Sequence, residues 1–320
     1  MQKKELGKAG TVSLFFLHCP IDLNFFDPMT RIVTFILLIS SLTTLAQYGG
    51  LKESLKVKSN ILSKDVEYSI YLPPDYETSN RRYPVLYLLH GYTDDETGWT
   101  QFGEAHLIAD RAIQNGEATP MIIVMPDAGV TWYVNSYDGK VNYEDFFVKE
   151  LIQHIDATYR TRTTKQYRAI SGLSMGGYGT MIMATKHPDL FSSAAPLSAG
   201  VFTDDEIMKG DDDMWNNVLG NIYGKKDLTG KNRITDHYNK NSILKIVETA
   251  NAEELKKVRY YIDCGDKDFL IKGNMALHAA MIDKKIPHEF RVRDGAHNWT
   301  YWRTALPEVL KFISESFHQK

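Results

Sequence analysis

Apolar and polar residues alternate along this chain in patterns that predict strands and helices in turn. Two alternating segments, residues 54–59 and 66–72, are typical of antiparallel strands at the edge of a sheet. Continuous apolar runs, which favour parallel strands buried on both faces, follow at residues 85–89, 121–125, 194–198 and 258–264. Shorter β-compatible runs lie at residues 167–171 and 289–293.

Helical patterns separate these strands. They cover residues 105–115, 143–159, 179–187, 274–282 and 299–318. This alternation predicts one α/β domain, built on a doubly wound, mostly parallel sheet with antiparallel N-terminal strands. The polar segment 202–250 breaks the rhythm, and we expect it to form short helices and loops that cover the end of the sheet as a lid.

The N-terminus carries a separate signal. Met29 and Arg31 precede the apolar run 32–39, and small residues follow as far as Ala46. This order is typical of a secretory signal peptide, and the run is shorter than the ~20 residues that a membrane-spanning helix needs. An uncleaved membrane anchor is the alternative. The expected organisation is an upstream extension at 1–28 with translation starting at Met1 or Met29, a signal peptide at 29–46, and a mature domain at 47–320.

Composition narrows the classes of function. A net charge of −3 over 320 residues gives no sign of nucleic-acid binding. Of the two cysteines, Cys19 lies in the segment expected to be lost, which leaves Cys264 alone in an apolar strand. Export permits disulfides, but one thiol cannot form one within the chain. Cys264 is therefore interpreted as a small buried residue.

The sequence Gly172-Leu173-Ser174-Met175-Gly176 joins a predicted strand to a predicted helix. At such a turn the serine is held in a strained backbone conformation with its hydroxyl exposed. Glycines are needed two positions before and after it, because a Cβ there would collide with the neighbouring strand or helix. Ser174 is therefore the candidate nucleophile.

A serine hydroxyl needs a base, and in this arrangement an acid and then a histidine follow the serine along the chain. His297 lies in a loop directly after the 289–293 strand, at the sheet edge where Ser174 is expected, and is the candidate base. The other histidines after Ser174 are interpreted as surface, capping or tail residues, apart from His237 in the 202–250 insertion, a weaker candidate.

Three carboxylates lie where the orienting acid is expected. Asp268 stands at the far end of the turn after the 258–264 strand and can reach toward the next loop, so it is favoured. Asp266 is the alternative, and Asp263 lies within the strand itself.

A tetrahedral oxyanion must be met by preorganised N–H donors. The backbone N–H of Met175, directly after the nucleophile, is one candidate. The second is the N–H of Tyr92, in a loop after the 85–89 strand where Gly91 lets the backbone turn closely. His90 is interpreted as a support beneath that loop.

Together these motifs resemble the esterase D superfamily of α/β-hydrolases. The likeness runs from Tyr83 to the C-terminus and rests on residues 83–91, 98–99, 172–179, 265–270 and 297–299. Feruloyl and acetyl-xylan esterases are the most similar branch. The resemblance implies an α/β-hydrolase fold and a serine esterase without metal or organic cofactor, acting on esters of plant cell-wall polysaccharide. It assigns the nucleophile, acid, base and oxyanion donors to Ser174, Asp268, His297, Tyr92 and Met175.

Alternatives remain within and beyond this superfamily. S-formylglutathione hydrolases are the nearest, but they are cytosolic and the signal peptide argues against them; mycolyltransferases share the fold but require a different cell envelope. A catalytically inactive carbohydrate-binding hydrolase fold would be expected to lack the nucleophile, acid or base. A metal-dependent deacetylase needs clustered His and Asp ligands, and no such spacing occurs around the predicted core.

Aromatic and polar residues near the expected mouth of the site are candidates for substrate contact. An aromatic side chain there suits a phenolic ring, and an amide suits sugar hydroxyls, although simple loop anchoring explains them equally well. The candidates are Trp99, Trp132, Asn135 and Trp299.

Overall fold

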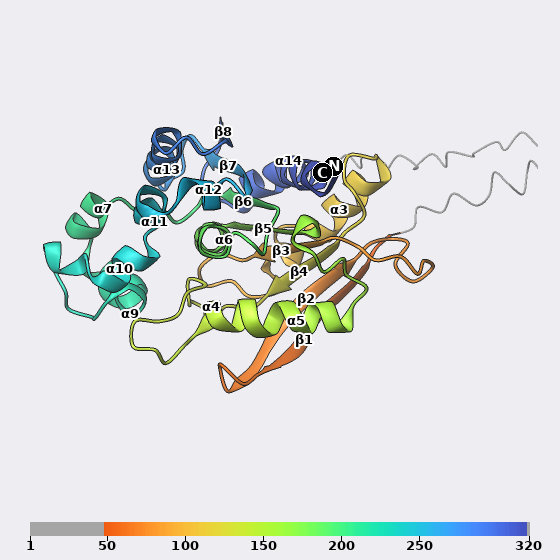
Figure 1. Ribbon diagram of the computed structural model, residues 1–320, viewed down its shortest axis with the longest axis horizontal. Helices are drawn as coiled ribbons and strands as arrows, with labels where there is room; N and C mark the ends of the chain where they lie inside the picture. The colour runs from red at the N-terminus through yellow and green to blue at the C-terminus, as the bar shows by residue number, and fades with distance from the viewer. Residues whose placement is uncertain (1–47, 319–320) are drawn as a thin grey trace, which may run out of the picture. The chain divides into compact units, whose positions relative to one another are not determined.

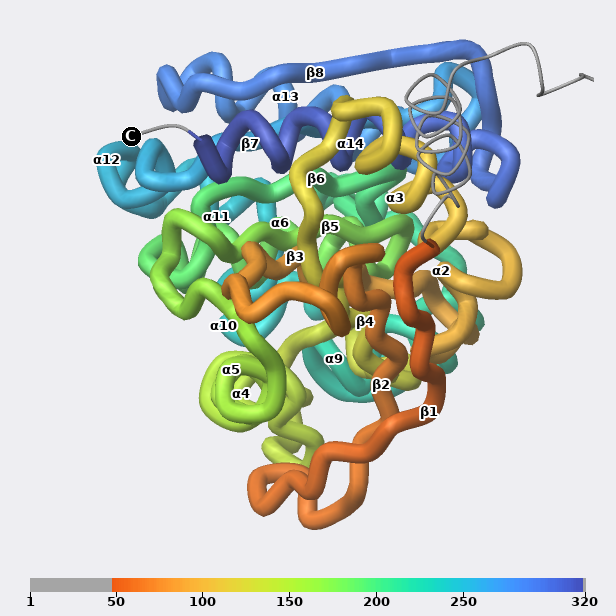
Figure 2. Tube along the Cα trace, turned by 90° about the vertical axis from the view of Figure 1, so that its right-hand side faces the viewer, coloured from red at the N-terminus to blue at the C-terminus, as the bar shows by residue number. Residues whose placement is uncertain are grey.

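An eight-stranded sheet runs through the centre of the protein. The computed structural model describes residues 48–318, so the expected extension and signal peptide lie outside the described residues. The strand order is β1-β2-β4-β3-β5-β6-β7-β8, which can be followed from one edge to the other in Figure 2. The strands are β1 (Gly50–Ser59), β2 (Lys64–Leu72), β3 (Val85–Leu89), β4 (Ile122–Pro126), β5 (Arg168–Leu173), β6 (Ser193–Leu197), β7 (Arg259–Gly265) and β8 (His288–Arg293).

The sheet is mixed, as the sequence predicted. β1 pairs with β2, and β2 with β4, in antiparallel register, whereas every pair from β4 to β8 is parallel. Among the described strands, β1 alone lies at this edge of the sheet. The expectation that both N-terminal strands lie at the edge was therefore wrong for β2, which pairs on both sides.

Helices follow most strands. The α-helices are α2 (Gly98–Gln101), α3 (Ala105–Gln114), α4 (Tyr143–Phe146), α5 (Ile152–Thr158), α6 (Met175–Lys186), α7 (Asp204–Lys209), α8 (Asp212–Met214), α9 (Gly220–Tyr223), α10 (Asp236–Asn241), α11 (Ile243–Thr249), α12 (Ala252–Leu255), α13 (Ile271–Asp283) and α14 (Trp299–His318). π-Helices occupy η2 (Phe147–Leu151) and η4 (Trp215–Leu219), and 3-10 turns occupy η3 (Lys165–Tyr167) and η5 (Gly230–Arg233).

Alternate residues of each central strand face two separate cores. In β3, Val85, Tyr87 and Leu89 belong to the larger core with α6. Leu86 and Leu88 belong to the second core, which α3 and α14 cover. Figure 1 shows α3 and α14 together on one side of the strands and α4 and α5 on the other. A strand buried on both faces must be apolar throughout, which explains the continuous runs in the sequence.

The insertion consists of short helices, as its composition predicted. The elements α7 to α11 follow one another with short connections, and Figure 1 shows α7, α9 and α10 gathered at one end of the domain. Among the described residues, no helix has both the length and the hydropathy required to cross a membrane.

Candidate active site

Ser174 lies between β5 and α6 on a strained backbone. Its φ of 54° and ψ of −116° place it in a region that non-glycine residues rarely adopt. The glycines around it have no room for a side chain: a Cβ on Gly172 would lie 2.6 Å from the carbonyl oxygen of Gly176, and one on Gly176 would lie 2.6 Å from that of His90. The half-buried hydroxyl of Ser174 is thus held at the sheet edge, as expected.

His297 joins Ser174 to a buried carboxylate. Its Nε2 lies 3.0 Å from Ser174 Oγ, and its Nδ1 lies 2.8 Å from Asp268 Oδ2. The other oxygen of Asp268 accepts a 2.9 Å hydrogen bond from the backbone N–H of Leu270. Residues from three separate loops, after β5, β7 and β8, therefore form one hydrogen-bonded series.

The environment of Asp268 keeps its carboxylate ionised. Burial raises its pKa, but the hydrogen bonds from His297 and Leu270 outweigh that effect, and the net pKa lies below the ordinary value. An ionised Asp268 fixes the Nδ1 proton of His297, so that Nε2 is free to accept the proton of Ser174.

The alternative acids have other partners. Asp266 Oδ1 accepts a 3.0 Å hydrogen bond from the backbone N–H of Gly295. Asp263 is fully buried, where it accepts hydrogen bonds from Tyr261 and Tyr301 and pairs with Arg293. Both carboxylates hold the loop that carries His297, and neither contacts its ring.

The other histidines after Ser174 are bonded elsewhere. His187 pairs with Glu144, His278 lies 2.7 Å from His288, and His318 lies 2.7 Å from Thr119. His237, the weaker candidate base, contacts the carbonyl oxygen of Asn135. The structure brings only His297 to Ser174.

The loop of Tyr92 lies beside the nucleophile. A Cβ on Gly91 would lie 3.7 Å from Ser174 Cβ, which is van der Waals contact, but only 2.7 Å from Leu173 Cδ1, so a side chain here would displace Leu173. Within the described residues, the backbone N–H groups of Tyr92 and Met175 make no hydrogen bond. Their assignment as oxyanion donors remains a prediction that this placement suits.

The four predicted substrate contacts differ in burial and in their packing and hydrogen-bond partners. Trp99 is 0% exposed, and its Nε1 donates to the carbonyl oxygen of Leu89, so it offers no surface to a substrate. The side chain of Asn135 accepts from the backbone N–H of Asp145 and anchors a loop. Trp299 is half-buried against Trp99, Phe102 and Trp302.

Trp132 lies close to the backbone of Ser174. A Cβ on Gly200 would touch both the Trp132 ring, at 2.7 Å, and the carbonyl oxygen of Ser174, at 3.5 Å. Trp132 and Tyr133 both have positive φ, 54° and 60°, in a loop whose strain the surrounding packing must hold. The Trp132 indole N–H is buried and has no hydrogen-bond partner among the described residues.

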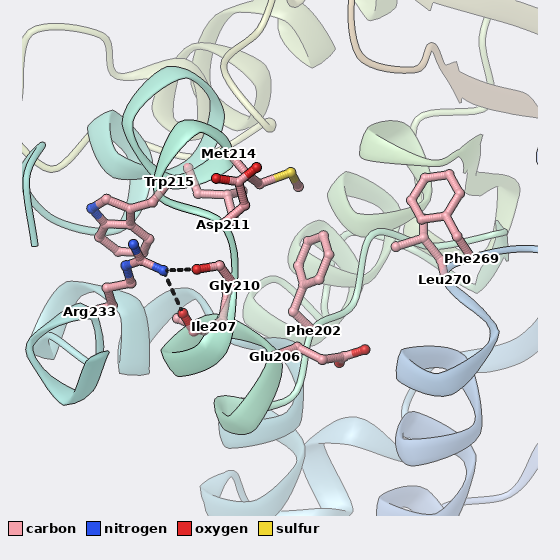
Figure 3. A pocket seen from close by; sticks show the side chains of 11 residues that line it. Phe202, Glu206, Ile207, Gly210, Asp211, Met214, Trp215, Arg233, Phe269 and Leu270 are labelled. Carbon is pink, nitrogen blue, oxygen red and sulfur yellow. Dashed lines mark hydrogen bonds between the residues drawn. The ribbon is translucent and has the colours of Figure 1, made fainter. Parts of the chain in front are cut away.

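A pocket of about 270 Å³ opens beside His297, and sequence reasoning did not find it. Phe269, 69% exposed, lies with its ring 4.5 Å from the His297 ring. In Figure 3, Phe202 lies between Phe269 on one side and Trp215 on the other. Beyond Trp215, Arg233 donates hydrogen bonds to the carbonyl oxygens of Ile207 and Gly210. The signal that could have revealed Phe269 is its position next to the predicted acid. The lining residues are Phe202, Glu206, Ile207, Gly210, Asp211, Met214, Trp215, Leu219, Arg233, Phe269 and Leu270.

Comparison with known proteins identifies the family of this chain. Residues 59–313 match the esterase family described as "Putative esterase". An endo-1,4-beta-xylanase/feruloyl esterase of Xylanibacter ruminicola is 37% identical over 146 residues, which are 43% of this chain but only 20% of that longer protein. S-formylglutathione hydrolase of Bos taurus is 26% identical over 295 residues, 82% of this chain and 93% of that enzyme.

A solved structure points the same way. A ferulic acid esterase superimposes with a TM-score of 0.71 at 32% identity, and the match covers 84% of this chain and 99% of that one. The sheet described above is that of an α/β-hydrolase, as the resemblance implied.

Proposed function

The chain belongs to this esterase family, and on that premise we propose that it is a secreted serine carboxylic-ester hydrolase. It removes feruloyl or acetyl groups from plant cell-wall polysaccharide through an acyl-enzyme on Ser174. The observation that carries this proposal is the hydrogen-bonded series of Ser174, His297 and Asp268 next to a pocket with aromatic side chains in its lining.

The chemistry has two halves. Ser174 Oγ attacks the carbonyl carbon of the ester while His297 Nε2 takes the hydroxyl proton, and the N–H groups of Tyr92 and Met175 meet the oxyanion. Collapse breaks the bond to the leaving alcohol, whose oxygen receives the proton from His297. Water then attacks the acyl-enzyme in the same way, releasing the acid and returning the proton to Ser174.

The pocket beside His297 suits an aromatic acyl group. Phe202, Trp215 and Phe269 contribute aromatic rings, and its volume of about 270 Å³ lies just below the ~300–1,000 Å³ of pockets for drug-sized ligands. One phenolic ring fits that size, and an acetyl group needs less.

Secretion rests on the sequence alone. The signal-like segment 29–46 precedes the domain. Expression of the whole chain in a bacterial host, followed by fractionation and N-terminal sequencing, tests this. Exported protein beginning at Gln47 supports it, and cytoplasmic protein that keeps residues 29–46 contradicts it.

S-formylglutathione hydrolysis is the second candidate, because the similarity to the Bos taurus enzyme spans 82% of this chain. A substrate panel separates the two. We expect kcat/KM for methyl ferulate or acetylated xylan to exceed that for S-formylglutathione, with a plain acetyl ester as reference. Preference for S-formylglutathione would reverse the assignment.

The Ser174→Ala variant tests the nucleophile. It should fold, with an unchanged melting temperature, and lose turnover of every ester in the panel. An organophosphate should transfer its phosphoryl group to Ser174 Oγ with loss of its leaving group, adding the mass of that phosphoryl group to the parent protein, and leave the variant unlabelled. Full turnover by a folded Ser174→Ala protein would end the proposal.

The Phe269→Ala variant tests the acyl pocket. It should raise KM for methyl ferulate about tenfold, the upper end of one aromatic contact, and leave turnover of an acetyl ester unchanged. Phe102→Ala is the matched control, because Phe102 is also an exposed aromatic residue but contacts Trp299 rather than His297. Equal losses on both esters would mean that Phe269 supports His297 rather than the acyl group.

A further inference from the structure

A second pocket, of about 190 Å³, lies between the loop after β4 and the insertion. Tyr92 is part of its wall, and Tyr92 follows Gly91, the residue that approaches Ser174. The pocket therefore begins next to the nucleophile. Its lining residues are Tyr92, Val130, Thr131, Val134, Ser136, Val141, Asn217, Val218, Asn221 and Ile222.

Trp132 separates this pocket from the one beside His297. Its ring packs on Tyr92 of the second pocket, with centroids 6.4 Å apart, and on Phe202 of the first, 6.1 Å apart. The same indole lies against the backbone of Ser174 through Gly200. An ester bound at Ser174 thus has a pocket on each side of Trp132, one for each half of the molecule.

One helical stretch of the insertion lines both pockets with different residues. Trp215 and Leu219, four residues apart, line the first pocket. Asn217 and Asn221, also four apart, line the second. Val218 and Ile222 line the second pocket as well. The stretch through η4 and α9 therefore presents apolar side chains to the first pocket and a mixture of amide and aliphatic side chains to the second.

The chemistry of the second pocket suits a neutral, hydroxyl-rich group. No charged residue is in its lining, whereas Glu206, Asp211 and Arg233 line the first. The side-chain amides of Asn217 and Asn221 are exposed and make no hydrogen bond with the described residues. Each amide offers two donors and an acceptor, which matches sugar hydroxyls. A carboxylate would lose water there without gaining a cation.

The two walls of the second pocket are joined before any ligand binds. The backbone N–H of Tyr137 donates to the carbonyl oxygen of Asn221 at 3.3 Å. His237 Nε2 donates to the carbonyl oxygen of Asn135 at 3.1 Å. Such bonds hold Asn221 in place and reduce the ordering cost of binding.

We propose that this pocket binds the carbohydrate half of the ester, with Asn217 and Asn221 as the residues that recognise sugar hydroxyls. The proposal rests on the proposed function, because it assigns the leaving group of that reaction. It also predicts a preference for sugar esters over glutathione thioesters, whose leaving group carries two carboxylates that this neutral pocket cannot pair.

Two esters with the same acyl group test the assignment. Methyl ferulate has an alcohol too small to fill the pocket, and the feruloyl ester of arabinose has a sugar. In the Asn217→Ala/Asn221→Ala double variant, kcat/KM for the arabinose ester should fall about tenfold, as expected for two lost hydrogen bonds, while that for methyl ferulate stays unchanged. Asn239→Ala is the matched control, an exposed asparagine of the insertion outside both pockets. An equal loss on both esters, or none on either, overturns the assignment.

Binding without catalysis separates failure of the subsite from failure of the proposed function. If the parent protein cleaves neither the feruloyl esters nor acetylated xylan, the proposed function fails. The subsite is then tested on the Ser174→Ala protein with an unesterified arabinose-substituted xylo-oligosaccharide. Calorimetric titration should show binding that the two alanine substitutions weaken about tenfold. No binding, or the same Kd in both proteins, refutes the subsite.

Discussion

His90 controls the orientation of a peptide in the candidate oxyanion hole. Its Nδ1 lies 2.8 Å from the carbonyl oxygen of Gly91, and its Nε2 accepts a 2.9 Å hydrogen bond from the backbone N–H of Ala128. Since Nε2 is an acceptor, the ring proton is on Nδ1. The C=O and N–H of a trans peptide point in opposite directions, so this bond turns the N–H of Tyr92 away from His90.

The His90→Asn variant should therefore lose transition-state stabilisation. We expect kcat to fall about 10- to 100-fold with little change in KM, because the oxyanion forms only during reaction. Steady-state kinetics on an aryl acetate, with thermal melting to check the fold, measure this. His318→Asn, remote on α14, is the control. A folded His90→Asn protein with the parent kcat would show that the loop holds its own orientation.

The acid can be tested by a pair of matched substitutions. Asp268→Asn should lower kcat by about 10³- to 10⁴-fold, since the amide neither holds the neutral imidazole of His297 in its productive tautomer nor stabilises the imidazolium that forms. Asp266→Asn should cost less than about tenfold, because Asp266 bonds only backbone N–H and stays outside the series. If Asp266→Asn has the larger effect, the assignment of the acid is wrong by two residues.

At the level of elements, the local apolar pattern predicted the bounds of those strands and helices whose burial is visible in their own sequence. The expected bounds of β3 and α14 agree with the observed Val85–Leu89 and Trp299–His318. Helix α6 begins at Met175, four residues before the expected start, because its glycine-rich first turn gives no apolar periodicity. The expected 143–159 helix contains a π-helix at Phe147–Leu151, which the apolar periodicity did not predict.

The pockets escaped prediction for a tertiary reason. Chain order and turn chemistry led to Ser174, Asp268 and His297 because the reaction itself fixes which residue types must follow the nucleophile. Phe269 and Asn217 have no such constraint. They line their pockets because the insertion packs against loops at the sheet edge that are distant in the sequence. Local sequence patterns do not predict such tertiary contacts.

Glu144 links α4 to the end of α6 and should make stability depend on pH. It is largely buried and bonds Lys186 at 2.8 Å and His187 at 2.9 Å. Burial raises the pKa of Glu144, but the bonds with His187 and Lys186 outweigh it, and the net pKa lies below the ordinary value. A lowered pKa in the folded state gives stability that is complete above the unfolded value of ~4.3 and is lost as pH falls through the folded one.

The Glu144→Gln variant should therefore be less stable than the parent at pH 7 and closer to it near pH 3. Urea unfolding at both values measures the difference. Glu254→Gln is the control, because the exposed Glu254–Lys257 pair is screened by solvent and contributes little. If the difference in free energy of unfolding between Glu144→Gln and the parent is as large at pH 3 as at pH 7, the substitution destabilises the protein through packing rather than through lost charge.

At the scale of the whole molecule, the part of the chain that the structure describes contains one cysteine, Cys264, and no disulfide bond. Cys264, in β7, is fully buried, as its apolar strand predicted. Burial and the nearby charge of Asp268 raise the pKa of the Cys264 thiol to about 12. Such a thiol neither ionises at neutral pH nor contacts solvent. Cys264 is therefore not available to form a disulfide bond in an oxidising compartment.

Thiol counting tests this together with the proposed cleavage. The folded mature protein should not react with a chromogenic disulfide reagent, because Cys264 is buried. In urea it should show one reactive thiol, since the proposed cleavage removes Cys19. The uncleaved chain in urea should show two. A reducing agent should leave the melting temperature of the mature protein unchanged. Fast labelling of the folded mature protein would mean that β7 opens locally, and two thiols in the exported protein would show that residues before Gln47 are retained.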